Sequence, residues 1–182
     1  MNDSYGTLIA PDTLRLQRSL PGPIERVWQY LTESGPRSRW LARGEMDLRP
    51  GGEVELMFQH DQLSEEQVPT PERYRTDDGC HRQQGRILAC EAPRLLSFTW
   101  READGGDSEV RFDLAPEGDR VLLTITHSRL RSRGMLLSVS AGWHAHVGIL
   151  VDRLEGREPR SFWPAHERLE AEYDRRLPRQ AA

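Results

Sequence analysis

Hydrophobic and polar residues alternate in several short segments of the chain, with the period of strands that bury one face. Residues common in turns, mainly proline, glycine and aspartate, separate these segments. We therefore predict antiparallel strands, including a hairpin at 45–58 with Pro50, Gly51 and Gly52 in its turn. The predicted strands are residues 13–20, 45–48, 53–58, 85–91, 94–100, 108–114 and 120–127.

Other segments have hydrophobic residues every three or four positions, which is the period of an amphipathic helix. Pro23 and Pro164 stand near the starts of the first and last of these segments, and Gly156 follows the longest. The predicted helices are residues 23–34, a short second helix at 37–42, a long helix at about 136–154, and a last helix at 163–177.

This order of elements predicts an α+β fold. A curved antiparallel sheet has one apolar face to cover, and the helix at 136–154 is the element long enough to cover it. We expect one domain over residues 1–156, with the sheet wrapped around this long helix, and a C-terminal helical extension over 157–182. A hydrophobic stripe in the last helix predicts that it packs on its own domain or on a second subunit in a homodimer; the stripe is Leu169, Tyr173 and Leu177.

The segment from Asp61 to Arg82 has no hydrophobic period. It is acidic and contains prolines, so it offers little apolar surface to offset the entropy of ordering. We predict an exposed loop that is mobile or acts as a gate.

Composition excludes several classes of function. The sequence contains no lysine, which excludes Schiff-base aldolases, pyridoxal-phosphate enzymes and Walker-type ATPases. The net charge is -4 without a basic block, so nucleic acid is not an expected partner. No apolar run is long enough to span a membrane and no signal peptide is recognisable, which predicts a cytoplasmic protein. Cys80 and Cys90 are expected to be reduced.

Two histidines in the long helix, His144 and His146, are separated by one residue. Residues two apart on a helix point to nearly opposite sides, so these two do not form a metal pair. His146 lies at the edge of the apolar stripe, where it either satisfies one hydrogen bond in the core or faces a ligand cavity. His144 lies on the flank and is expected at the surface.

The other histidines show no metal-binding pattern. His60, Cys80 and His81 match no zinc spacing. His166 and Glu170 are four residues apart, which is typical of an exposed helical pair. We predict no metal, no cofactor and no catalytic residue.

Five stretches of the sequence, in order, resemble the helix-grip superfamily known as SRPBCC or START-like. The nearest branch is similar to the C-terminal domain of the activator of heat-shock protein 90 ATPase. The stretches are ERVWQYLTESGPRSRW, LRPGGEVEL, GRILACEAPRLLSFTW, EVRFDLAPEGDRVLLTITHSRL and GWHAHVGILVDRLEG. The resemblance implies a cavity between the sheet and the long helix. The loop at 61–82 and the segment after Gly156 depart from the family pattern, and either could reshape the mouth of that cavity.

The resemblance leaves function open, because relatives include binders, cyclases, hydrolases and a chaperone partner. Our first expectation is non-catalytic binding of a small hydrophobic or amphipathic ligand. The alternatives are a protein-interaction module that binds a chaperone in the stress response, and an enzyme that uses His127 or His146 as acid or base. The predicted ligand-binding residues are Trp40, Phe58, Phe98, Trp100, Phe112, His127, Trp143, His146, Val147 and Leu150.

Overall fold

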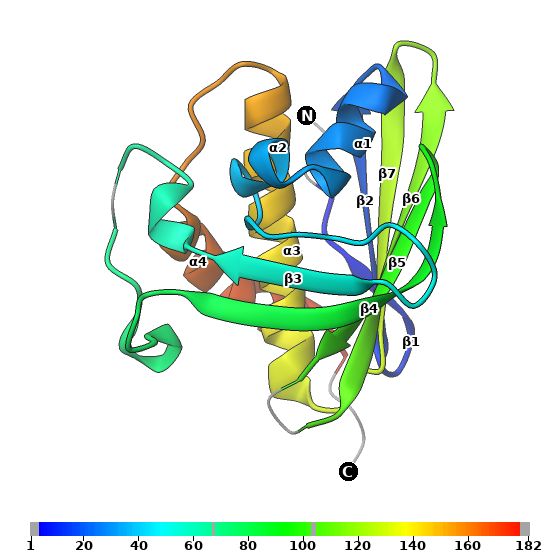
Figure 1. Ribbon diagram of the computed structural model, residues 1–182. Coiled ribbons are helices and arrows are strands. Elements are labelled where there is room, and N and C mark those ends of the chain that lie inside the picture. Colours follow the sequence, from blue (N-terminus) through cyan, green and yellow to red (C-terminus); the bar gives the residue numbers. More distant parts are fainter. Residues whose placement is uncertain (1–3, 67, 103–104, 179–182) are drawn as a thin grey trace.

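A curved antiparallel sheet wraps around one long helix (Figure 1). The computed structural model describes residues 4–66, 68–102 and 105–178, and within them the strand order is β1-β2-β7-β6-β5-β4-β3. The strands are β1 (Thr7–Ala10), β2 (Thr13–Pro21), β3 (Glu53–Phe58), β4 (His81–Glu91), β5 (Leu95–Arg101), β6 (Asp107–Glu117) and β7 (Arg120–Ser128). The helices are α1 (Ile24–Thr32), α2 (Ser34–Ser38), α3 (Arg133–Leu154) and α4 (Phe162–Arg176), with short 3-10 helices η1 (His60–Gln62) and η2 (Glu72–Tyr74).

The alternation in β7 places one of its two apolar faces in the core. Leu123, Ile125 and His127 are buried, whereas Leu122 on the other face is half-buried. Sequence alone did not separate these faces, since both carry leucine. Contact with the helix decides between them, because only the inner face is covered.

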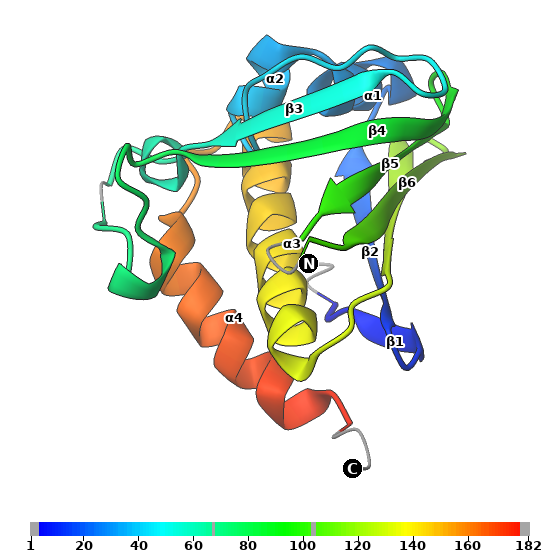
Figure 2. The same ribbon diagram turned by 60° about the horizontal axis from the view of Figure 1, so that its bottom comes forward.

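A glycine lets β4 cross from one partner strand to the other. β4 pairs with β3 through residues 81–86 and with β5 through 87–91. A Cβ atom on Gly85 would lie 1.8 Å from the carbonyl oxygen of Thr99, so only glycine permits this close approach. Beyond this point, β3 and the first half of β4 extend across α3 (Figure 2).

The long helix α3 is the core helix of the fold. Its N-terminus is capped by Ser132, whose side chain accepts a hydrogen bond from the backbone N–H of Met135. Gly156, with φ of 72°, follows its end as predicted. By length and composition α3 could cross a bilayer, but it lies between the sheet and α4, where His144 and His146 are both buried.

α4 packs against α3 of its own chain (Figure 2). The hydrophobic stripe predicted to find a partner is buried in this contact; it consists of Leu169, Tyr173 and Leu177. The segment after residue 156 therefore contributes directly to the core.

Two local predictions were wrong, and a third was confirmed in part. β1 was not predicted, because this edge strand is short and largely exposed and so lacks a clear alternation. Residues 45–48 form no regular strand, but the predicted hairpin pairing is present: Met46 bridges Val54, and two backbone hydrogen bonds join Asp47 to Glu53 and Glu55 to Glu45. α2 ends at Ser38, so Trp40 lies in the turn that follows it.

A buried arginine holds that turn in place. The guanidinium of Arg37 donates hydrogen bonds to the carbonyls of Thr32, Ala42 and Gly44. Burial lowers the pKa of Arg37 to about 10, so the group stays charged at neutral pH. The indole of Trp40 donates to the carbonyl of Tyr30 at 2.7 Å, which fixes the backbone that contacts α3.

Candidate functional site

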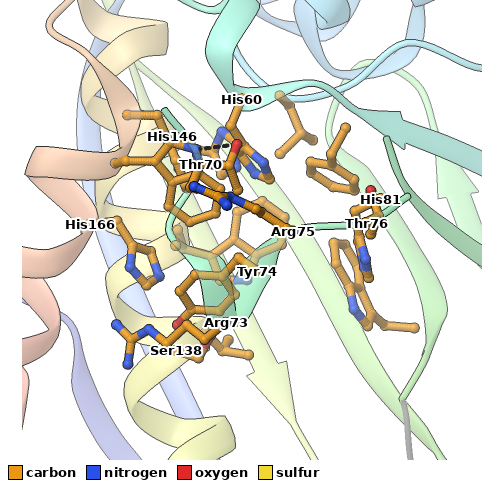
Figure 3. A pocket seen from close by; sticks show the side chains of 18 of the residues that line it. His60, Thr70, Arg73, Tyr74, Arg75, Thr76, His81, Ser138, His146 and His166 are labelled. Atoms are coloured by element: carbon orange, nitrogen blue, oxygen red, sulfur yellow. Dashed lines mark hydrogen bonds between the residues drawn. The ribbon is translucent and has the colours of Figure 1, made fainter. Parts of the chain in front are cut away.

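A cavity of about 460 Å³ lies between α3, α4, the inner face of the sheet and the segment from His60 to His81 (Figure 3). Exposed lining residues are concentrated at 73–79, so the mouth of the cavity lies there. Its aromatic wall consists of Phe58, Tyr74, Trp100, Trp143, Phe162 and Trp163. Five of the six histidines of the chain also line it: His60, His81, His127, His146 and His166.

Small side chains on α3 leave this space open. Ser138 and Gly142 are spaced four residues apart and so lie along one side of the helix, one turn before His146. A Cβ atom on Gly142 would meet no atom within 4 Å. The absence of a side chain at Gly142 therefore contributes directly to the volume of the cavity.

Stacked rings build the end of the cavity near α4. The ring of His60 stacks on Phe162, with centroids 4.2 Å apart, and on Phe58 at 5.5 Å. The ring of Tyr74 stacks on Trp163 at 5.0 Å. Flat aromatic surfaces separated by open space suit a planar apolar ligand.

Both nitrogens of His127 are occupied by hydrogen bonds. The indole N–H of Trp143 donates to Nδ1 at 3.0 Å, which assigns the ring proton to Nε2. Nε2 then donates to the Oγ of Ser108 at 2.7 Å, and this hydroxyl donates to Glu102. Burial lowers the pKa of His127 to about 3, so the ring is neutral and has no free nitrogen for a ligand.

His146 has one nitrogen bound and one facing the cavity. Its Nδ1–H donates to the carbonyl of Trp40 at 2.7 Å, so Nε2 carries a lone pair. Burial lowers the pKa of His146 to about 3. The ring lies 5.3 Å from His60 and 4.5 Å from Phe162, measured between centroids.

The prediction that His144 lies at the surface was wrong. It points to the other side of α3 from His146, as predicted, but α4 and the N-terminal segment cover it there. Its Nδ1 lies 3.0 Å from the hydroxyl of Tyr173, and its ring packs on Tyr5 at 4.9 Å. His144 is therefore a buried structural residue outside the cavity.

The exposed pair predicted for His166 and Glu170 was also wrong. His166 is 3% exposed and lines the cavity, and its pKa is lowered by burial. Glu170 instead binds Arg73 of η2 at 2.6 Å. The helix turns His166 inward because the adjacent Trp163 and Leu169 are buried on the same side.

The segment predicted as an exposed loop contains part of the cavity wall. Leu63 and Cys80 are buried, and the indole N–H of Trp163 donates to the hydroxyl of Thr70 at 3.1 Å. α4 supplies the apolar surface that the segment lacks by itself, so the sequence of the segment did not reveal this packing. Its mobility and gating remain predictions.

The predicted ligand-binding residues divide into two groups. Phe58, Trp100, His127, Trp143 and His146 line the cavity. The remaining five are buried in the closed core and do not line it: Trp40, Phe98, Phe112, Val147 and Leu150. Periodicity identified the inward faces, but it did not show where along each face the packing stops.

The lining residues missed from the sequence come mainly from α4 and the preceding long loop. They include His60, Tyr74, Phe162, Trp163 and His166. The Phe162–Trp163 pair at the start of an amphipathic helix was a usable signal, whereas the histidines follow no common spacing. Within the described ranges, no group of three histidine, cysteine or acidic side chains is placed to hold a metal.

A curved antiparallel sheet that grips a long helix defines the helix-grip class of α+β proteins. The chain belongs to the family described as Activator of Hsp90 ATPase homolog 1-like protein, whose model matches residues 21–155. No curated protein matches the chain.

Solved structures share this fold. The BPP1335 protein from Bordetella parapertussis is 39% identical with a TM-score of 0.78, and the match covers 97% of this chain and 92% of that one. CalU16 from Micromonospora echinospora is 25% identical with a TM-score of 0.67, covering 90% of this chain and 86% of that one. DynU16, a putative protein in the dynemicin biosynthetic locus, is 21% identical with a TM-score of 0.63 and shares the fold, covering 82% of this chain and 49% of that one.

Proposed function

We propose that the protein binds a small, mainly apolar aromatic molecule in this cavity without transforming it. The supporting observation is an open space of about 460 Å³ between stacked aromatic rings and the small residues of α3. Ligand cavities commonly measure about 300–1,000 Å³ and combine apolar walls with a few polar groups. The cavity therefore has the size and the lining of a binding site.

The polar mouth favours an amphipathic ligand. Arg73 and Arg75 line the cavity and are exposed to water, as is Thr76. A bound molecule would bury its aromatic body among the rings and keep its polar end at these residues. This orientation leaves no charge of the ligand in the apolar interior.

The arrangement of the histidines favours binding over catalysis. A general base needs a free nitrogen and a pKa near the working pH. His127 has no free nitrogen, and burial holds the pKa of His146 at about 3. The hydrogen bond of His146 to the carbonyl of Trp40 raises its pKa, but burial outweighs this effect.

Binding of a chaperone, with a role in the stress response, is the alternative that family membership supports. It differs from our proposal in its site, because a chaperone would contact the outer surface. Filling the cavity would leave chaperone binding unchanged and would abolish uptake of a small ligand.

Two glycines of α3 provide the test. Gly142→Leu places a side chain in the cavity, whereas Gly148→Leu places one in open space outside the lining. Each change gains up to about 1 kcal/mol of helix propensity, so neither protein should be destabilised. We expect Gly142→Leu to weaken binding of the apolar dye N-phenyl-1-naphthylamine by at least about tenfold and Gly148→Leu by less than about twofold. Equal dye affinity in the two variants would show that the cavity is not the binding site.

A further inference from the structure

Three histidines of the cavity carry nitrogen lone pairs that no described residue satisfies. The Nδ1–H of His146 donates to the carbonyl of Trp40, which leaves a lone pair on Nε2, and within the described residues no hydrogen bond to this lone pair is formed. The Nδ1 of His166 is buried without a hydrogen-bond partner. Within the described part of the chain, the side chain of His60 makes ring contacts and no hydrogen bond, and it lies between Phe58 and Phe162.

These three rings surround Phe162 on the α4 side of the cavity (Figure 3). His60 and His146 are 5.3 Å apart, and both His146 and His166 contact the ring of Phe162, at 4.5 and 5.6 Å. His146 and His166 are 4% and 3% exposed, so bulk water does not readily satisfy their nitrogens. Buried acceptors without donors are costly, and a ligand that supplies a donor removes that cost.

The charges around the cavity restrict the donor to a neutral group. The Nε2 of His146 is an acceptor, because the ring proton is on Nδ1, so it pairs with a donor and not with a carboxylate or phenolate oxygen. Arg73 and Arg75 at the mouth oppose entry of a cation. Of the carboxylates nearby, Glu170 is bound to Arg73, and Glu102, which lines the cavity, accepts a hydrogen bond from Ser108. The hydroxyl group of an aromatic ring fits both the acceptors and the stacked walls.

We propose that the cavity selects phenols, whose hydroxyl donates a hydrogen bond to the cluster of His60, His146 and His166. This inference rests on the proposed function and adds the chemical class of the ligand. The phenol binds in its neutral form, with the ring between the aromatic side chains and the hydroxyl at the histidine nitrogens around Phe162.

Three compounds of one ring size test it by calorimetric titration: naphthalene, 2-methoxynaphthalene and 2-naphthol. We expect 2-naphthol to bind at least about tenfold more tightly than 2-methoxynaphthalene, which has no donor. His146→Phe and His166→Phe keep an aromatic ring and should reduce this preference below about threefold, with naphthalene affinity nearly unchanged. Gly148→Leu, outside the lining, is the control and should keep the full preference.

The outcomes separate the two proposals. Equal affinity for all three compounds overturns the phenol selectivity and leaves the proposed function intact. Failure of all three to bind overturns both. A preference for 2-naphthol that survives substitution of each of His60, His146 and His166 by phenylalanine also overturns the inference, because the hydroxyl would then bind elsewhere.

A second measurement uses the unsubstituted chain and does not depend on the folding of any variant. The side-chain nitrogen chemical shifts of histidine report whether each lone pair accepts a hydrogen bond. We expect Nε2 of His146 and Nδ1 of His166 to shift with 2-naphthol and not with 2-methoxynaphthalene. Identical spectra with the two compounds would contradict the proposal.

Discussion

Two faces of α3 differ in the volume of their side chains. Val147 and Leu150 belong to the closed face, where packing excludes all solvent. Ser138, Gly142 and His146 belong to the open face, along which the cavity runs. A single helix therefore supports both a solid core and a cavity, because Val147 and Leu150 fill one side whereas Ser138 and Gly142 leave space on the other.

The two faces also differ in polarity. Side chains against the closed face are mainly aliphatic, whereas the cavity collects His60, His127, His146 and His166 among its rings. Neutral histidine is apolar enough to be buried and can still accept or donate a hydrogen bond. The open side is consequently the part of the molecule that responds to acid.

Acidification should produce the largest effect, and it should act through the open side. The folded-state pKa values of His127 and His146 are about 3, below the ordinary value of 6.5, because of burial. The unfolded chain then binds more protons than the folded chain below pH 6.5, so stability present above this pH is lost as pH falls toward 3. Each histidine costs about 1.4 kcal/mol per pH unit in that window.

The measurement is urea unfolding at pH values from 7 to 4. His146→Phe removes one of these histidines, so the free energy of unfolding should fall less steeply with decreasing pH, by about 1.4 kcal/mol per pH unit. This difference in slope is expected whatever the substitution does to stability at neutral pH. A slope that is unchanged in this variant would show that His146 is protonated in the folded protein.

A matched pair of valines should give a smaller effect that separates the two faces. Val147→Phe adds a ring to the closed face and should cost about 1–3 kcal/mol of stability, without altering binding of N-phenyl-1-naphthylamine. Val139→Phe adds the same ring to the cavity lining, where space exists, and should cost less than about 1 kcal/mol and weaken dye binding. Urea unfolding and dye titration of both variants check this, and the reverse order of stability losses would contradict the distinction between the faces.

The smallest effect on stability concerns the segment that covers the mouth. Glu170 binds Arg73 in this segment, and both are partly exposed, so Glu170→Gln should change global stability by less than about 1 kcal/mol. Release of this contact should nevertheless speed cleavage within residues 61–80 by a protease. Glu172→Gln, on the same helix, removes ion pairs with Arg175 and Arg176 only within α4 and serves as the control. Equal cleavage rates in the two variants would show that the Arg73 contact does not hold the segment.

Much of the sheet followed from the sequence because alternation reports directly which strand positions are buried. β3 illustrates this, since Val54, Leu56 and Phe58 are buried whereas Glu53 and Glu55 are exposed. The cavity lining was predicted less well, because α4 and the segment from His60 to His81 approach α3 from distant parts of the chain. The sequence pattern of α4 shows that one of its faces is buried, but it does not show which other element covers that face. The polar pattern of the segment from His60 to His81 does not show that it packs at all.

The sequence by itself determined the α+β class, the long helix ending before Gly156, and the apolar faces that meet in the core. These properties depend on local periodicity and on turn and cap residues, which act over a few positions. Only the tertiary structure decided that His144 is covered by Tyr173, that His166 lines the cavity, and that Val147 does not. The burial of a side chain depends on all the elements that pack around it, and the contacts that enclose α3 join residues more than a hundred positions apart, such as Trp40 and His146.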